Sequence, residues 1–444
     1  MKIQKQNIKQ LRPFLLLWST QSFSALGSAM TSFALVIWSY QQEGSALTTA
    51  LMTICSYAPY VLMSIFAGAL SDRWDQRRTM LISDGFAALC TLVVLALLKT
   101  GALAIWHLYV LNALTGLMNT VQQPASAVAV SLLVPKEQYQ RVGGMQAFGN
   151  ALVTVLTPVL ASAALAFFGL DAVILFDLFT CAAAMVTLSC FIHLPEKTAR
   201  RMKKEPVLAA AKSGLVYLRQ NRGVLDLILF LAAINLTASM YNAALPAMLL
   251  SRPNGGETVL GLVNACTGLA TLVGSVIVSI RPAPKSRVRV ILNALLFSMS
   301  TENLMLALGR SVPVWCAAAV LGWLFIPVMN ANMDALLRTY IPVDMQGRVY
   351  SARNTLQFFT IPLGYLLGGY LVDRVLEPLM AVDTGGPLFS LLGSGKGAGA
   401  ALLFLIAAAL GVITCLAFRC DRRLWALEKG GTPPLSESTA ELGE

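Results

Sequence analysis

The chain has 444 residues, of which 56% are apolar and only 12% are charged. A water-soluble domain carries about 25% charged residues, so this composition excludes an ordinary globular protein and indicates a chain solvated mostly by lipid. The formal net charge of +11 would suit a nucleic-acid-binding protein. That class is excluded because the basic residues are distributed between apolar segments instead of gathering on one polar domain.

Runs of about 20 apolar residues, long enough to cross about 30 Å of hydrocarbon, recur along the whole chain. The sequence therefore predicts an all-α membrane protein with twelve transmembrane helices in two groups of six. The expected spans of the first group are 14–40, 47–70, 79–98, 104–133, 143–168 and 170–194. Those of the second group are 224–250, 257–280, 288–309, 313–337, 349–373 and 398–418.

The distribution of basic residues predicts the orientation in the membrane, because connections rich in Lys and Arg stay in the cytoplasm. Most of the 33 Lys and Arg residues fall at the two termini and in the connections on the same side as the termini. The connections on the opposite side contain only Lys99, Arg252, Arg310, Arg374 and Lys396. Both termini are therefore expected in the cytoplasm.

The only long inner connection divides the chain into two halves. We expect an N-terminal six-helix half, a cytoplasmic linker, a C-terminal six-helix half and a disordered cytoplasmic tail, at 1–194, 195–223, 224–420 and 421–444. After a basic run, the linker places apolar residues at helical spacing from Val207 to Leu218. This pattern predicts an amphipathic helix at the inner membrane surface.

The inner connection between the second and third spans carries a recognisable motif. It reads Gly68-Ala-Leu-Ser-Asp72-Arg73-Trp-Asp75-Gln-Arg77-Arg78. It resembles the signature loop of the major facilitator superfamily of transporters, G-x-x-x-D-R/K-x-G-x-R/K-R/K, with Asp75 in place of the second glycine. The resemblance implies the major facilitator fold, in which two six-helix halves are related by pseudo-symmetry.

Further motifs narrow the resemblance to the bacterial macrolide-efflux group of drug:proton antiporters. These motifs are Trp18-Ser-Thr-Gln21-Ser-Phe-Ser24-Ala-Leu-Gly27-Ser28, Pro342-x3-Gln346-Gly347-Arg348 and Gly368-Gly369-x3-Asp373-Arg374. The resemblance implies a monomeric secondary transporter of the bacterial cytoplasmic membrane that exports bulky amphipathic compounds against protons. The alternatives in the same fold are an exporter of a native metabolite such as a siderophore, or a lysophospholipid flippase. The alternative from another class is a non-transporting receptor or assembly factor.

The resemblance also implies a gate on the inner face. In this superfamily the acid of the signature loop approaches the inner end of span eleven when the cavity faces outward. We therefore expect Asp72 to contact the first turn of span eleven, whose positive dipole attracts a carboxylate. The expected gating residues are Gly68, Asp72, Arg73, Arg77, Arg78, Arg348 and Arg353.

Acidic residues inside the spans are candidate proton carriers. A charge in the bilayer costs about 2.5–3.5 kcal/mol on insertion scales, so each such acid requires a partner or a function. The candidates are Asp84, Asp177, Glu302 and Asp334. Asp334 is shallower and lies four residues from Arg338, a spacing that also allows an ordinary helical ion pair.

If the superfamily arrangement holds, spans one, four, seven and ten line a central cavity. Their uncharged polar and aromatic residues are Gln21, Ser24, Asn119, Gln122, Gln123, Asn235, Tyr241, Asn242, Trp323, Asn330 and Asn332. Amides and rings among aliphatic side chains suit a bulky amphipathic solute. The same residue types also join helices to one another inside membranes, and that reading stays open for each residue.

Nothing in the sequence predicts an enzyme, a metal site or a cofactor. His107 and His193 stand alone near span ends, and the sequence has no H-E-x-x-H, G-x-S-x-G or P-loop motif. The eight cysteines form no C-x-x-C pair. The expected partners are a small amphipathic substrate, protons and the lipid bilayer, and the energy is expected to come from an ion gradient.

Overall fold

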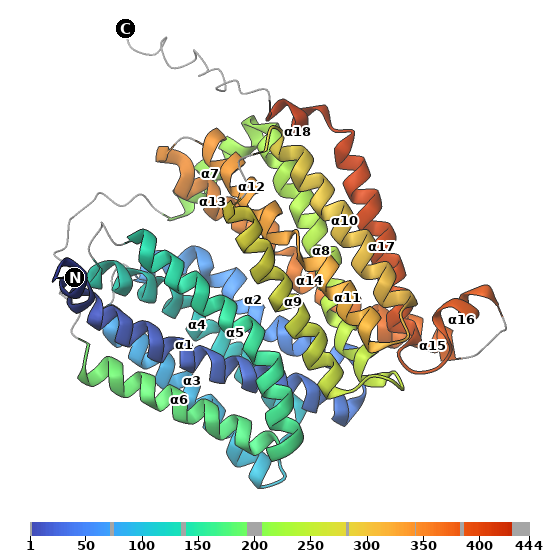
Figure 1. Cartoon of the computed structure of the whole chain (residues 1–444), viewed down its shortest axis with the longest axis horizontal. Helices are drawn as coiled ribbons and strands as arrows, with labels where there is room; N and C mark the ends of the chain where they lie inside the picture. The colour runs from blue at the N-terminus through green and yellow to red at the C-terminus, as the bar shows by residue number, and fades with distance from the viewer. Residues whose placement is uncertain are drawn as a thin grey trace.

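The structure is a computed structural model that describes residues 2–71, 75–134, 139–192, 207–280, 284–341, 343–381 and 386–428. All regular secondary structure in these ranges is helical (Figure 1). The N-terminal half contains α1 (Lys2–Glu43), α2 (Ala46–Ser71), α3 (Gln76–Lys99), α4 (Ile105–Leu133), α5 (Tyr139–Phe168) and α6 (Leu170–Cys190).

A short helix, α7 (Val207–Gln220), precedes the C-terminal half and covers the stretch in which the sequence predicts an amphipathic helix. The C-terminal half begins with α8 (Arg222–Ser251), α9 (Glu257–Ile280), α10 (Arg287–Leu308), α11 (Val312–Trp323) and α12 (Ile326–Tyr340). It continues with α13 (Val343–Phe358), α14 (Thr360–Leu371), the π-helix η2 (Val372–Leu376) and α15 (Glu377–Ala381). It ends with α16 (Pro387–Leu392), α17 (Ala398–Arg419) and α18 (Arg422–Ala426).

Within the described ranges, 11 helical segments are long and apolar enough to cross a membrane. They correspond to all of the expected spans except span four. That span is α4, a helix of 29 residues that is long enough but carries His107, Asn119, Gln122 and Gln123 among its apolar residues. These polar side chains lower its hydropathy below that of the other spans.

Two spans of the C-terminal half contain more than one helical segment. Span ten consists of α11 and α12, separated by a turn at Leu324 and Phe325. Pro327 stands at the start of α12 and has no N–H to continue the hydrogen bonding of α11, which explains the break. Span eleven comprises α13 and α14, between which Phe359 keeps helical dihedral angles and donates its N–H to the Thr355 carbonyl at 3.1 Å, and α14 then widens into η2. Span eleven also continues as α15 to Ala381, beyond its expected end at residue 373.

The signature loop ends in a helix cap. Asp75 is the N-cap of α3, and its Oδ1 accepts a hydrogen bond from the backbone N–H of Arg78 at 2.7 Å. The Arg77 guanidinium donates from Nε to the Leu188 carbonyl at 3.1 Å and from Nη2 to the Ser189 carbonyl. Arg77 therefore satisfies carbonyl groups at the end of α6, which otherwise have no partner within their own helix.

The two halves are arranged as a V (Figure 1). We call the end that carries the N-terminus, α7 and α18 the inner end, following the charge distribution. The ribbons of the two halves separate toward this end and converge at the opposite, outer end. The halves meet mainly through α5 with α9 and α2 with α14.

Glycines allow both contacts between the halves to be close. A Cβ on Gly369 of α14 would lie 2.7 Å from the Leu47 Cα of α2. A Cβ on Gly261 of α9 would lie 2.8 Å from the Pro158 carbonyl oxygen of α5. Helices in membranes pack tightly where small residues let their backbones approach in this way.

Candidate functional site

The outer ends of the two halves are joined by a carboxylate from the C-terminal half. Asp373 of η2 accepts hydrogen bonds from the Ser45 hydroxyl at 2.6 Å, the Ala46 N–H at 3.0 Å and the Leu47 N–H at 2.8 Å. Asp373 thereby caps the N-terminus of α2, which begins at Ala46. An anionic group at a helix N-terminus is also stabilised by the helix dipole.

Further polar contacts surround this cap. The Tyr40 hydroxyl of α1 donates to the Ala247 carbonyl of α8 at 3.2 Å and lies 2.6 Å from the Ser251 hydroxyl oxygen. Gln41 of α1 donates to the Glu257 carboxylate, and the Ser162 hydroxyl of α5 donates to the Glu257 carbonyl at 3.2 Å. Helices α1, α2 and α5 are thus all bonded to the C-terminal half at the outer end.

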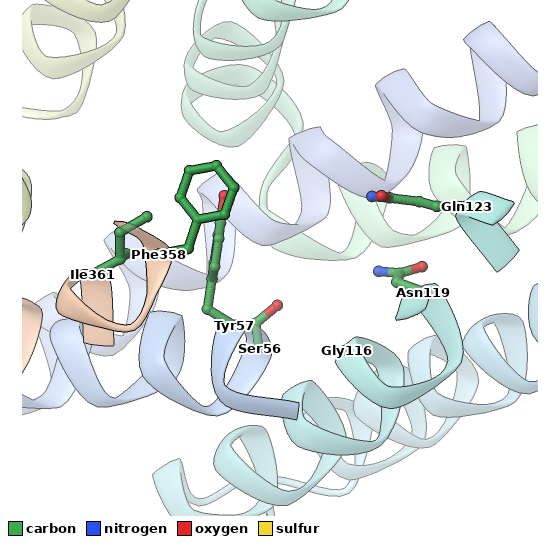
Figure 2. A pocket seen from close by; sticks show the side chains of 7 residues that line it. All are labelled: Ser56, Tyr57, Gly116, Asn119, Gln123, Phe358 and Ile361. Carbon is green, nitrogen blue, oxygen red and sulfur yellow. The ribbon is translucent and has the colours of Figure 1, made fainter. Parts of the chain in front are cut away.

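A cavity of about 320 Å³ lies between the halves (Figure 2). Its wall from the N-terminal half consists of Ser56 and Tyr57 of α2 and Gly116, Asn119 and Gln123 of α4. Phe358 and Ile361 of the C-terminal half close the other side. Figure 2 shows the Tyr57 and Phe358 rings on one side of the space and the amides of Asn119 and Gln123 on the other.

The position of Ser56 along α2 places this cavity at mid-membrane depth. Ser56 lies ten residues after the start of α2, so it is about 15 Å along the helix from the outer end. That distance is half of the roughly 30 Å hydrocarbon thickness. A smaller cavity of about 170 Å³, lined by Thr49, Thr53, Asn242 and Tyr365, lies one to two turns nearer the outer end.

Asp84 connects α3 to the helix that forms the cavity wall. Asp84 is 6% exposed, and its carboxylate accepts hydrogen bonds from the Gln21 amide of α1 at 3.1 Å and from the Gln122 amide of α4. Gln122 is adjacent in sequence to Gln123, whose side chain lines the cavity. Two residues expected in the cavity therefore bind an expected proton carrier instead.

Asp177 of α6 forms a second buried carboxylate cluster in the N-terminal half. It is 4% exposed and accepts hydrogen bonds from the Ser28 hydroxyl at 2.8 Å and the Thr91 hydroxyl at 3.4 Å. Gly27 of α1 allows this contact, because a Cβ there would lie 2.9 Å from the Asp177 Cα. This cluster joins α1, α3 and α6 and does not include any residue that lines the cavity.

Glu302 of α10 is the most deeply buried candidate, at 3% exposed. Its Oε1 accepts a hydrogen bond from the Trp323 indole N–H at 3.0 Å, and the Tyr241 hydroxyl of α8 also interacts with this carboxylate. A Cβ on Gly322 would lie 2.2 Å from Glu302 Oε2. Trp323 and Tyr241 were expected to line the cavity, but the structure directs both to Glu302.

Of the remaining residues that were expected in the cavity, some line a cavity in the structure and others do not. Asn119 and Gln123 line the cavity between the halves, and Asn242 lines the smaller one. Ser24 is buried beside Cys181, and the Asn235 amide of α8 donates to the Gln357 carbonyl of α13 at 3.3 Å. Asn330 is exposed, whereas Asn332 is buried and donates to the Val328 carbonyl of its own helix. Asn235 therefore joins two helices, α8 and α13, which is the alternative role that the sequence left open for these polar residues.

Sequence reasoning missed Ser56, Tyr57, Phe358 and Ile361, because it assigned the cavity to spans one, four, seven and ten alone. A signal was present in span two. Thr49, Thr53 and Ser56 recur at helical spacing and give α2 a polar stripe within an apolar helix.

The expected inner gate is only partly within the described residues. Asp72 and Arg73 lie outside them, whereas Gly68 is in α2 and Arg348 is in α13. Arg353 of α13 forms an ion pair with Asp334 of α12 at 3.5 Å and donates to the Gln357 side chain at 3.0 Å. The contact between Asp72 and span eleven stays a prediction.

Comparison with known proteins agrees with this architecture. The chain is 22% identical over 377 residues to macrolide efflux protein A of Streptococcus pyogenes, covering 84% of this chain and 92% of that protein. It is 24% identical over 374 residues to the multidrug efflux pump Tap of Mycolicibacterium fortuitum, covering 81% and 89%. A crystal structure of a mutant of the nucleoside transporter NupG has the same fold, with a TM-score of 0.66 and 14% identity over 91% of this chain and 98% of that one.

A comparison with family models shows to which family the chain belongs. The sequence model of the Major Facilitator Superfamily matches residues 17–248, which is more than half of the protein. The helical architecture and the similarity of 84% of the chain to a macrolide efflux protein agree with this match. The chain belongs to the major facilitator superfamily of transporters and resembles its macrolide-efflux group.

Proposed function

We propose that this protein is a secondary active exporter of bulky amphipathic compounds, macrolide-like drugs among them, in the bacterial cytoplasmic membrane. It works by alternating access and exchanges its substrate for protons. The similarity to macrolide and multidrug efflux proteins supports the substrate class.

The observation that carries the proposal is the mid-membrane cavity between the halves. Tyr57 and Phe358 provide aromatic faces for an apolar body, and the Asn119 and Gln123 amides provide donors and acceptors for its polar groups. Ligand pockets generally combine apolar and aromatic walls with a few polar groups. None of the seven lining residues is charged, so the cavity suits an amphipathic compound better than a phosphate or a dicarboxylate.

The proposed topology has twelve spans, with α4 as the span of lowest hydropathy and both termini in the cytoplasm. In this arrangement the structure represents an inward-facing state. The bonded outer ends and the separation of the ribbons toward the inner end support this assignment.

We assign proton coupling to Asp84. As an ionised carboxylate it accepts the two amide N–H groups of Gln21 and Gln122, which belong to α1 and α4. A protonated carboxyl is itself a donor with reduced acceptor capacity, so proton binding changes how α1 and α4 are held. Because Gln122 belongs to α4, which also carries the cavity residues Asn119 and Gln123, this change acts on a helix that forms the cavity wall.

The inner gate completes the proposed cycle. In the outward-facing state, Asp72 contacts the start of span eleven, near Arg348 and Arg353. Arg353 would then exchange part of its interaction with Asp334 for one with the signature loop.

Everted membrane vesicles test the function. Energised vesicles that contain the protein are expected to accumulate a radiolabelled macrolide, and a protonophore is expected to abolish the accumulation. A drug-susceptibility panel in an efflux-deficient bacterial host then defines the substrate range. A properly folded protein that accumulates no solute from this panel would exclude drug export and favour the receptor or assembly-factor alternative.

A further inference from the structure

The C-terminal half contains a second, larger cavity of about 670 Å³, between α9, α10 and α12. All of its lining residues lie between Ile277 and Ala335, so it is separate from the cavity between the halves. Val328, Ala331, Asn332 and Ala335 line it from one face of α12, at the spacing expected of a single helical face. We call this cavity the inner crevice.

The inner crevice has the depth of one membrane leaflet. Arg287, the first residue of α10, lines its inner end, and Phe297 lines it ten residues farther along the same helix. Ten helical residues span about 15 Å, which is half of the roughly 30 Å hydrocarbon thickness. At the deep end, Phe297 packs edge-on against Phe325 with ring centroids 5.5 Å apart. Close to this end, α9 meets span ten, where a Cβ on Gly274 would lie 2.2 Å from the Leu324 carbonyl oxygen.

Among the described residues that line the inner crevice, the one charged residue is Arg287, at its shallow end. Arg287 lines the mouth, and Arg419 of α17 donates to the side chain of Asn293, another lining residue, at 3.3 Å. The nearby carboxylate of Glu428 is already occupied, because it accepts hydrogen bonds from the Ser286 hydroxyl and the Val288 N–H at the start of α10. The crevice therefore combines an apolar slot within the membrane with cations at the level of the lipid headgroups.

We propose that the inner crevice binds one anionic phospholipid of the inner leaflet. Its phosphate lies at Arg287, near Arg419, and one acyl chain extends along α10 toward Phe297 and Phe325. Basic residues at the cytoplasmic surface attract anionic lipid headgroups, and basic pockets between transmembrane helices bind them. A bound lipid would fill the space beside α12, directly below the break in span ten.

Native mass spectrometry of the delipidated protein in detergent tests the proposal. Phosphatidylglycerol and phosphatidylcholine with identical acyl chains are added separately, and the fraction of protein that retains one lipid is measured. The wild type is expected to retain phosphatidylglycerol about fivefold better, the preference that one basic residue near the headgroup provides. Arg287→Gln is expected to remove this preference, and Ala331→Leu, which narrows the slot, to reduce retention of both lipids.

Arg289→Gln is the matched control. Arg289 belongs to the same turn of α10, but it is exposed, lies over the Trp425 ring at 6.0 Å and does not line the inner crevice. The control is expected to keep the wild-type preference, and thermal unfolding verifies that each variant is folded. Equal retention of the two lipids by the wild type, or an equal loss of preference in both arginine variants, would overturn the proposal. Displacement of the lipid by a macrolide in the wild type but not in Ala331→Leu would also overturn it, since the crevice would then be a site for the transported solute.

Discussion

The Asp373 carboxylate accepts a 2.6 Å hydrogen bond from the Ser45 hydroxyl and, with two backbone N–H groups, caps α2 from the opposite half of the molecule. Ser45, the residue that precedes α2, provides the ordinary local cap, because its hydroxyl oxygen accepts a hydrogen bond from the Thr48 N–H at 3.0 Å. The Ala46 and Leu47 N–H groups instead bind Asp373, which lies 328 positions after Ser45, so this part of the cap forms only while the outer ends of the two halves are together.

Asp373→Asn is expected to shift the protein toward the outward-open state. The substitution removes the charge and leaves a single acceptor oxygen, and a hydrogen bond to a charged group contributes about 1.5–3 kcal/mol. This loss corresponds to at least about a tenfold change in the equilibrium between the two states. Spin labels at the exposed positions Gln42 and Leu379, in a background without native cysteines, should show a larger population of long distances.

Ser45→Ala serves as the graded control for this measurement. It removes one of the three hydrogen bonds to Asp373, together with the bond from the Thr48 N–H to the Ser45 hydroxyl, which lies within the N-terminal half and does not connect the two halves. It is expected to give a smaller shift in the same direction. Identical distance distributions in the wild type and Asp373→Asn would mean that the cap does not hold the outer side closed.

Phe358→Ala is expected to weaken binding of a macrolide about tenfold, because it removes an aromatic wall of the central cavity. The matched control is Phe359→Ala, since Phe359 is the next residue, is 54% exposed and does not line the cavity. Fluorescence or calorimetric titration of the purified variants compares the two. An equal loss of affinity in both would argue against this cavity as the substrate site.

Asp84→Asn is expected to uncouple transport from the proton gradient. The asparagine keeps the size of the side chain and cannot release a proton, so drug accumulation in energised vesicles should fall to the level of vesicles without a gradient. Binding of the drug should persist, since Asp84 does not line the cavity. Asp177→Asn alters an equally buried acid and is expected to retain gradient-driven accumulation. The reverse pattern would move proton coupling from Asp84 to Asp177.

Gly322→Ala is expected to lower the thermal stability of the C-terminal half. The added Cβ would lie 2.2 Å from the Glu302 carboxylate, which is held by Trp323, and such overpacking costs about 1–3 kcal/mol. Gly143→Ala is the control, because a Cβ there meets no atom within 4 Å and the helical backbone of α5 accepts alanine. The midpoint of thermal unfolding in detergent measures the difference. Equal midpoints for both variants would show that the side chains around Glu302 can rearrange to accept the added methyl group without loss of stability.

Local chemistry determined which features the sequence could predict. The apolar runs predicted where most of the helices lie, because any segment that crosses hydrocarbon must be both helical and apolar. Asp75, which departs from the signature pattern, was readable in principle, since an aspartate directly before an apolar helix is a typical N-cap. Its part in the structure is to bind the Arg78 N–H, a role that comparison with the signature pattern alone does not predict.

Contacts between segments that are distant along the chain could not be predicted from the sequence. Helical spacing offered Arg338, whose side chain is outside the described residues, as the partner of Asp334. The structure also pairs Asp334 with Arg353 of the next span, a contact that helical spacing could not predict. Likewise, Gln21 and Gln122 are as polar as Gln123, and only the rotation of α1 and α4 in the fold directs two of these amides to Asp84 and the third into the cavity. Helix rotation depends on the packing of neighbouring helices, which a single sequence does not specify.

Prolines give spans in both halves points at which they can bend. Pro59 lies inside α2, and Pro327 follows the turn at Leu324 and Phe325 in span ten. Proline removes a backbone hydrogen bond from a helix, and sharp helix kinks occur almost always at such positions. Because Pro59 lies two residues after Tyr57, bending of α2 there changes the shape of one wall of the central cavity. A pocket with an adjustable wall can accommodate solutes of different shapes, which is the property that the proposed export of different drugs requires.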